Sequence, residues 1–377
     1  MRSLFFILLL SSGLVQAGDD VAVETLTYEG KVAYGEVAGP GDIKMPFVKM
    51  ANAKVAAKIN DQLFISQFGV MAPEKPGKVL SAADHIVIEG TRTQDFAVER
   101  SRGRVLTMSF DAEGCGAYCE NYASYFSFDT SNGHPISAED LLTPAGMRAL
   151  DGRMKKERIA KYRQQIVSLR SQLKARQKKH DAKAKADIED LEARISMNED
   201  CMEQAAAPDG DSGMGAFAYN AFVLTDDAFR YTRHRCSNHA SRALDDVDDV
   251  TLSIAYPEMR NYLTGYGKTL LLNEGDSTPA NTPFGQILRG HLGGNIAISM
   301  LLRRYSDNSL GGVYFYDKYR KPITVSGRVA GNALELSEEA DNGVAGAKMK
   351  LTISGGHLKG RWIGKKEFLM ELNQGSN

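Results

Sequence analysis

One stretch of the sequence, Cys115 to Leu142, constrains the fold more than any other. In residues 121–128 most of the rings fall on alternate positions, which is typical of a β-strand with one aromatic face. Residues 129–133 predict a turn, because Asn and Gly tolerate positive φ and Asp or Ser can bond nearby amides. Ser137, with Asp140 three residues later, predicts a capped helix start. The stretch therefore predicts a strand, a turn and a short helix in succession.

The first residues of the sequence predict export. Arg2 is a short positive region, and Leu4 to Leu10 is an unbroken apolar run that is too short to span a bilayer. The small residues that end at Ala17 suit a cleavage site, so we expect a signal peptide over 1–17. No later segment is apolar for long enough to span a membrane. We therefore expect a periplasmic or secreted protein without a membrane span.

Composition narrows the class of partner. The 377 residues are 43% hydrophobic and 25% charged, which is ordinary for a globular chain. A net charge of −1 gives no global basic field, so nucleic acid is not expected as a partner. The 4 cysteines of an exported chain favour disulfides.

The N-terminal part mixes strand and helix patterns. Residues 51–68 have apolar side chains at helical spacing and predict an amphipathic helix. Further strands are predicted at 86–90, 96–101, 105–111, 217–224, 229–234 and 252–256. Pro257 predicts a helix over 257–263 that Gly265 or Gly267 ends. The pattern indicates an α+β domain over 18–275, with an antiparallel sheet and packed helices.

Residues 153–203 have a different character, because apolar side chains recur there at steps of three and four. Residues 153–179 are rich in Lys and Arg, whereas 187–203 are rich in Asp and Glu. Opposite charges on the two arms favour an antiparallel helical hairpin, inserted with its linker over 151–207. Nucleic-acid binding by the basic arm is the alternative, and the acidic arm beside it argues against it.

The last hundred residues have a period of two throughout. Short strands are predicted at 296–302, 312–316, 323–329, 333–336, 347–353, 358–363 and 368–372. Turns rich in Gly, Asn and Asp separate them, which is typical of an antiparallel meander. Residues 276–377 therefore predict an all-β module, either a small barrel or a sandwich, with Trp362 in its core.

Several blocks of the first domain resemble the extracytoplasmic RsiV/PdaC-type family. These blocks are Cys115–Tyr118, Tyr125–Asp129 with the Gly133 turn, Ile136–Leu142, Ala56–Asn60, Phe222–Asp227 and Ile254–Leu263. The resemblance covers roughly residues 20–272, with the helical hairpin as an insertion. It implies an α+β domain that binds lysozyme in anti-sigma factors and accompanies peptidoglycan deacetylases as a non-catalytic part. The Thr-Phe-Asp-Asp-Gly-Pro motif of the deacetylase catalytic domain is absent from this sequence.

The cysteines allow two interpretations. Cys115 and Cys119 could join His234, Cys236 and His239 in a zinc site. The other interpretation is a disulfide framework, which we favour because thiolates rarely persist in an oxidising compartment. The pairs that we expect are Cys115–Cys119, which closes a small ring, and Cys201–Cys236, which ties the acidic helix to the following strand pair.

Two acidic segments could be calcium sites, but their spacing is more typical of turns. Asp245, Asp246, Asp248 and Asp249 crowd one short segment, and Asp209 to Gly213 resembles half of a calcium loop. Neither spacing brings ligands together as a calcium loop does. We therefore expect a solvated turn and a flexible linker, with no metal and no cofactor.

The cysteine corner is the candidate binding site. Tyr118, Glu120 and Tyr122 could present rings and a carboxylate to a sugar or a protein, although rings there could equally belong to the core. We expect a monomeric, exported, non-catalytic protein that binds an envelope protein such as a lysozyme, or a peptidoglycan fragment. The alternative is a metal-dependent hydrolase of cell-wall material that uses His234 and His239.

Overall fold

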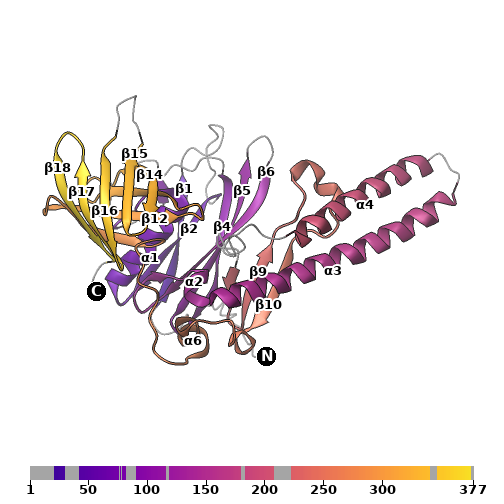
Figure 1. Ribbon diagram of the computed structural model, residues 1–377, viewed down its shortest axis with the longest axis horizontal. Helices are drawn as coiled ribbons and strands as arrows, with labels where there is room; N and C mark the ends of the chain where they lie inside the picture. The colour runs from indigo at the N-terminus through magenta and orange to yellow at the C-terminus, as the bar shows by residue number, and fades with distance from the viewer. Residues whose placement is uncertain are drawn as a thin grey trace, which may run out of the picture.

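The computed structural model describes residues 21–29, 42–75, 77, 79–81, 91–115, 119–179, 183–207, 222–339 and 346–374. A β-barrel lies at one end of the molecule, a long helical hairpin projects from the other, and smaller sheets lie between them (Figure 1). The α+β prediction is confirmed. The predicted signal peptide and the segment from Asp209 to Gly213 lie outside the described residues. Within those residues, no helix is long and apolar enough to cross a membrane.

The first sheet is formed by β1 (Val21–Glu29), β2 (Lys44–Met50) and β3 (Val79–Ser81). Its order is β2-β1-β3, with β2 antiparallel and β3 parallel to β1. Helix α1 (Ala53–Phe68) begins at the cap Asn52 and packs on this sheet, as the apolar spacing predicts. Its Asn60 is buried and pairs with both backbone groups of Val48, at 2.8 Å each, so the helix is fixed to β2.

The second sheet follows chain order through β4 (Thr91–Arg102), β5 (Val105–Cys115), β6 (Cys119–Asp129) and β7 (His134–Pro135). The strands predicted at 96–101 and 105–111 are parts of β4 and β5, and the one predicted at 86–90 lies outside the described residues. Leu106, Phe110 and Phe128 face α1, so rings and apolar side chains of the second sheet cover the other side of that helix.

The third sheet has the order β10-β9-β8, built from β8 (Phe222–Leu224), β9 (Ala228–Arg233) and β10 (Val250–Ala255). The short helices α2 (Ala138–Leu141), α5 (Tyr256–Met259) and α6 (Gly265–Leu272) share a core cluster with it, whereas the 3-10 turn η3 (His239–Leu244) contacts α4 (Ala184–Ala206). The capping box of Ser137 and Asp140 is present at the start of α2, as predicted.

The prediction that Gly265 or Gly267 ends a helix over 257–263 was wrong. Helix α5 ends earlier, at Met259, and Gly265 begins α6 instead, behind the cap Thr264. Gly267 is required by packing: a Cβ there would lie 2.3 Å from the carbonyl oxygen of Leu141. Gly267 therefore allows α6 to lie directly against α2, which local turn propensity does not reveal.

The projecting hairpin consists of α3 (Pro144–Gln177) and α4 (Ala184–Ala206), which run antiparallel (Figure 1). The first turns of α3 are part of the domain core, because Met147, Leu150 and Met154 are buried there. Further along, the two arms pack along each other, and the buried residues there are Tyr162, Ile166, Leu169 and Leu191. Ion pairs join Arg170 to Glu199 and Arg176 to Asp187, so opposite charges do meet across the hairpin.

The C-terminal module is a closed eight-stranded antiparallel barrel. Its strands are β11 (Ile287–Leu292), β12 (Ile296–Arg304), β13 (Ser309–Tyr316), β14 (Pro322–Ala330), β15 (Ala333–Glu338), β16 (Lys348–Ser354), β17 (His357–Ile363) and β18 (Glu367–Asn373). The sequence did not predict β11, whose pairing with β18 closes the barrel. Apolar side chains fill the interior, and Trp362 packs half-buried against them.

Helix α1 also contacts the barrel. Asp61 is 5% exposed and binds Arg289 of β11 at 2.5 Å, while the side chain of Gln62 donates to the carbonyl of Gly285 at 3.0 Å. An apolar seam continues beside these polar contacts, formed by Ile65, Met71, Ile287, Leu301 and Phe315. The polar residues of α1 are therefore buried because the helix has neighbours on both sides.

Candidate functional site

The cysteine corner lies at the end of the β5–β6 hairpin. Cys115 and Cys119 are opposite each other in the strand register and form a disulfide, with their Cα atoms 4.0 Å apart. The bond links the end of β5 to the start of β6 covalently. Tyr118, the first predicted contact residue, lies outside the described residues.

Glu120, the predicted carboxylate, is held by an arginine that the sequence did not single out. Arg235 donates to one oxygen of Glu120, and the Nδ1 atom of His239 lies 4.0 Å from the other. The Glu120 side chain is 43% exposed, whereas that of Arg235 is only 11% exposed. The carboxylate therefore reaches solvent, but its charge is already balanced from within the protein.

Tyr122, the third predicted contact residue, combines an exposed ring, as a binding residue would have, with a hydroxyl that is held by the protein. Its ring is one of the large apolar groups that remain exposed, at 43%. Its hydroxyl forms a hydrogen bond of 2.8 Å with the hydroxyl of Thr91 at the start of β4. The hydrogen bond fixes the direction of the ring without covering it, so the ring presents an oriented face on β6, three residues after Cys119.

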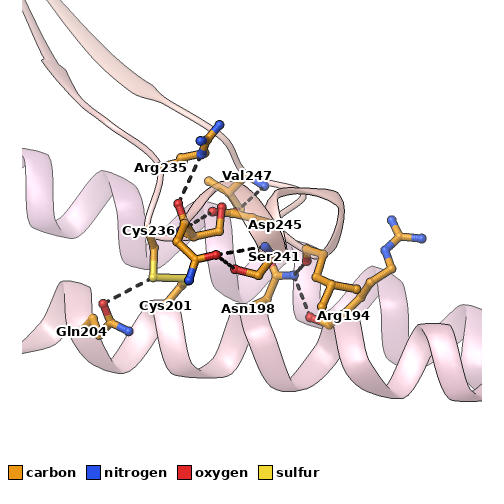
Figure 2. Close-up of a disulfide and its surroundings, with 12 residues drawn as sticks. Arg194, Asn198, Cys201, Gln204, Arg235, Cys236, Ser241, Asp245 and Val247 are labelled. Carbon is orange, nitrogen blue, oxygen red and sulfur yellow. Dashed lines mark hydrogen bonds between the residues drawn. A yellow bond between two sulfur atoms is a disulfide. The ribbon is translucent and has the colours of Figure 1, made fainter. Parts of the chain in front are cut away.

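The second disulfide anchors the neighbouring segment. Cys201 of α4 is bonded to Cys236, with Cα atoms 5.5 Å apart, and this pair and the first are the two expected from the sequence. Figure 2 shows the loop that carries Cys236 lying along α4. Asn198, fully buried, donates to the carbonyl of Leu244 at 3.2 Å, and Arg194 binds Asp246. The loop is thus attached to the helix at more than one point.

The acidic segment 245–249 has structural partners. Asp245 accepts from the backbone N–H groups of Ser237 and Val247 (Figure 2). Asp246 accepts from Arg194, and Asp249 accepts from the backbone of Arg235 at 2.8 Å. These carboxylates hold the loop in place.

The residues that the zinc interpretation would use as ligands form disulfides and ion pairs instead. All the cysteines form disulfides. His234 pairs with Asp249 at 3.1 Å, while His239 faces Glu120. Over the described parts of the chain, no three His, Cys, Asp or Glu side chains are grouped as metal ligands.

A second polar cluster lies in the core, under the turn that follows β6. Asp129 is fully buried and accepts hydrogen bonds from Arg104, from Ser131 and from the hydroxyl of Tyr266 at 2.8 Å. Burial alone would raise the pKa of Asp129, but these donors, with Arg104 the strongest, hold the pKa below its usual value. The Asp129 carboxylate raises the pKa of Tyr266 further than burial alone does.

The cluster around Asp129 explains why this stretch organises the domain. Its carboxylate joins the end of β6 to α6, which is 137 residues away in the sequence. Sequence reasoning missed Arg104 and Tyr266, because neither stands in a motif or near Asp129 along the chain. The residues that carry the family resemblance here have structural roles in the core.

No family model and no curated protein matches the chain. Among solved structures, the chain has a distant neighbour in a crystal structure of a member of the DUF3298 family from Bacteroides fragilis. The two are 14% identical, the match covers 68% of this chain and 99% of that one, and the TM-score is 0.37. The resemblance to the RsiV/PdaC-type family stays a prediction.

Proposed function

We propose that the protein is an exported, non-catalytic binding protein whose contact surface includes the cysteine corner. The partner is an envelope protein such as a lysozyme, or a peptidoglycan fragment. The observation that carries this proposal is the exposed, oriented ring of Tyr122 beside a covalently closed hairpin end.

Preorganisation is the physical reason to place the contact there. The disulfide closes the hairpin end, and the ion pair between Glu120 and Arg235 attaches it to the loop that carries Cys236. Little ordering entropy is lost when such a surface binds. Tyrosine rings suit it as well, because they supply contact area with few torsions to freeze.

The ion pair also changes the expected electrostatics. A free Glu120 would speed the approach of a basic partner, with a rate that falls as salt rises. Arg235 balances that charge from a side chain that is only 11% exposed, so the corner offers a partner little net charge. We therefore expect binding that depends on Tyr122 more than on ionic strength.

Binding measurements on matched tyrosine variants test the proposal. Immobilised protein is exposed to a lysozyme and, separately, to soluble peptidoglycan fragments. Tyr122→Ala should weaken the binding that the unmodified protein shows by about tenfold or more, as truncation of an interface aromatic does. Tyr319→Ala is the control, because Tyr319 is 66% exposed on the barrel. Equal affinity of the Tyr122→Ala variant and the unmodified protein would move the contact surface elsewhere.

The hydrolase alternative predicts a different measurement. A metal-dependent enzyme that uses His234 and His239 should purify with stoichiometric zinc and should lose it when either histidine is replaced. The binding protein should purify without it. Metal analysis of the purified protein therefore separates the two classes without knowledge of the substrate.

A further inference from the structure

A small pocket lies at the seam between the α+β domain and the barrel. Its volume is about 190 Å³. Ile65 and Ser66 of α1 form one wall, and the outer face of β12 and β13 forms the other. We name this the seam pocket; it is lined by Ile65, Ser66, Leu301, Arg303, Tyr305, Gly311, Gly312 and Val313.

The seam pocket exists because side chains are missing from β13. Gly311 and Gly312 line the pocket with backbone alone, and a Cβ on Gly312 would lie 2.2 Å from the carbonyl oxygen of Leu301, so a side chain does not fit there. A Cβ on Gly311 would lie 3.1 Å from the hydroxyl of Tyr305, which shows that the tyrosine lies across the hollow. The glycine pair and the tyrosine together shape the cavity.

The floor of the pocket is apolar. Ile65 and Leu301 are buried residues of the seam cluster, and Val313 packs against the same cluster. A cavity of roughly 150 Å³ with aliphatic walls takes up benzene, so the seam pocket has room for one ring or one branched alkyl group. Its floor favours such a group over water.

The rim of the pocket carries a cation with a free guanidinium. Arg289 is bound to Asp61, and Arg304 is bound to Asn308. Arg303 has no hydrogen-bonding or ionic partner among the described residues, and it lines the pocket. A guanidinium matches a carboxylate with two parallel hydrogen bonds, and such charge-assisted bonds are roughly twice as strong as neutral ones.

We propose that the seam pocket binds a small carboxylic acid that carries one ring or one branched alkyl group. The apolar group lies on Ile65, Leu301 and Val313, and the carboxylate pairs with Arg303. The hydroxyl groups of Tyr305 and Ser66 lie in the same lining and provide further hydrogen bonds. The site is separate from the cysteine corner, so it stands whether or not the proposed function is right.

The position of the pocket means that a bound ligand would also stabilise the contact between the two domains. One wall belongs to α1 and the other to the barrel, so a bound acid contacts both domains. A ligand that binds only the assembled seam stabilises the folded protein in proportion to its occupancy. The pocket therefore couples a small acid to the attachment of the two domains.

Phenylacetate is a suitable probe, and phenylacetamide is its neutral counterpart of the same shape. Methyl NMR spectra of the full protein are recorded while each compound is added. Phenylacetate should shift the methyl signals of Ile65, Leu301 and Val313 saturably, with a dissociation constant of about 1 mM for a ligand of this size. Phenylacetamide should bind about tenfold more weakly, because it has no charge to offer Arg303. The methyl signals of Ile298, in the barrel interior, should not move.

Two variants and one control complete the test. Arg303→Met should weaken phenylacetate binding about tenfold and leave phenylacetamide unchanged. Gly311→Val should abolish the binding of both, because its side chain fills the hollow. Arg304→Met is the control, because Arg304 contacts Asn308 on the barrel surface, and it should bind as the unmodified protein does. Absence of saturable shifts, equal affinity for acid and amide, or full binding by Arg303→Met would each overturn the proposal.

Discussion

Arg235 donates to Glu120, and this ion pair joins the two segments that the disulfides close. Glu120 follows Cys119 in the sequence, and Arg235 precedes Cys236. The two partners are 115 residues apart. The ion pair therefore links the corner to the base of the helical hairpin, and we refer to the two together as one unit.

Replacement of the buried partner tests this unit. Arg235→Met should lower the free energy of unfolding by about 1–2 kcal/mol, because Glu120 loses a charge-assisted partner while staying partly solvated. Arg361→Met is the control, since its pair with Glu367 is largely exposed and should contribute less than about 1 kcal/mol. Urea unfolding curves give both values. Equal losses in the two variants would show that the Arg235 pair has no special role.

The two disulfides should contribute unequally to stability. On the chain-entropy model, Cys201–Cys236 closes the longer loop and contributes about 4 kcal/mol, whereas Cys115–Cys119 contributes about 2 kcal/mol. Double Cys→Ser variants, one for each pair, measured by chemical denaturation, check the order. Peptide mapping without reduction checks the pairing, and a peptide that joins Cys115 to Cys201 or Cys236 would contradict it.

Acid should destabilise the protein partly through Asp129. Its folded-state pKa is lowered, so its contribution to stability is present above the unfolded value near pH 4 and is lost as pH falls through the folded value. Asp129→Asn should be less stable than the unmodified protein at pH 7, and its stability should fall less between about pH 4 and pH 2. Denaturation midpoints across this range measure the difference.

A control for Asp129 is available in the barrel. Asp307 also has a lowered pKa, caused by hydrogen bonds from Ser309, but it is fully exposed. Asp307→Asn should leave the acid profile close to that of the unmodified protein. Similar acid profiles for the two variants would show that burial of Asp129 does not decide the effect.

The outer half of the helical hairpin should be dispensable for folding. Replacement of residues 173–192 by a short Gly-Ser loop removes contacts made between the arms and keeps Asn198 and Cys201, which hold α4 to the body. The melting temperature should change by no more than about 4 °C, as expected for a loss near 1 kcal/mol. A larger fall would mean that the tip supports the domain; removal of Asn198 and Cys201 as well provides the comparison.

The features that the sequence predicts correctly are local ones. The capping box of Ser137 and Asp140 lies within four residues, and the strands of the barrel alternate along a few residues each. The hairpin arms follow from heptad spacing and charge sign. In each case the signal and the structure that it specifies occupy the same short stretch of chain.

The features that the sequence does not predict depend on distant neighbours. Nothing near Glu120 indicates Arg235, and nothing near Asp129 indicates Tyr266. Strand β11 escapes the alternation rule because Arg289, Gly290 and His291 interrupt its apolar residues. The arginine at position 289 forms an ion pair with Asp61 of α1. The glycine at position 290 is required by packing, because a Cβ there would lie 1.8 Å from a carbonyl oxygen of β18.

The double role of α1 limits how the chain can be divided. Asp61 is buried and relies on Arg289 and Arg320, both supplied by the barrel. A fragment cut before the barrel would keep the acid and lose both of its cations, and an isolated barrel would expose the apolar seam around Phe315. Either part transplanted alone would therefore need new residues at the seam, on α1 in one case and around Phe315 in the other. The seam therefore makes the two parts mutually dependent, although each has its own core.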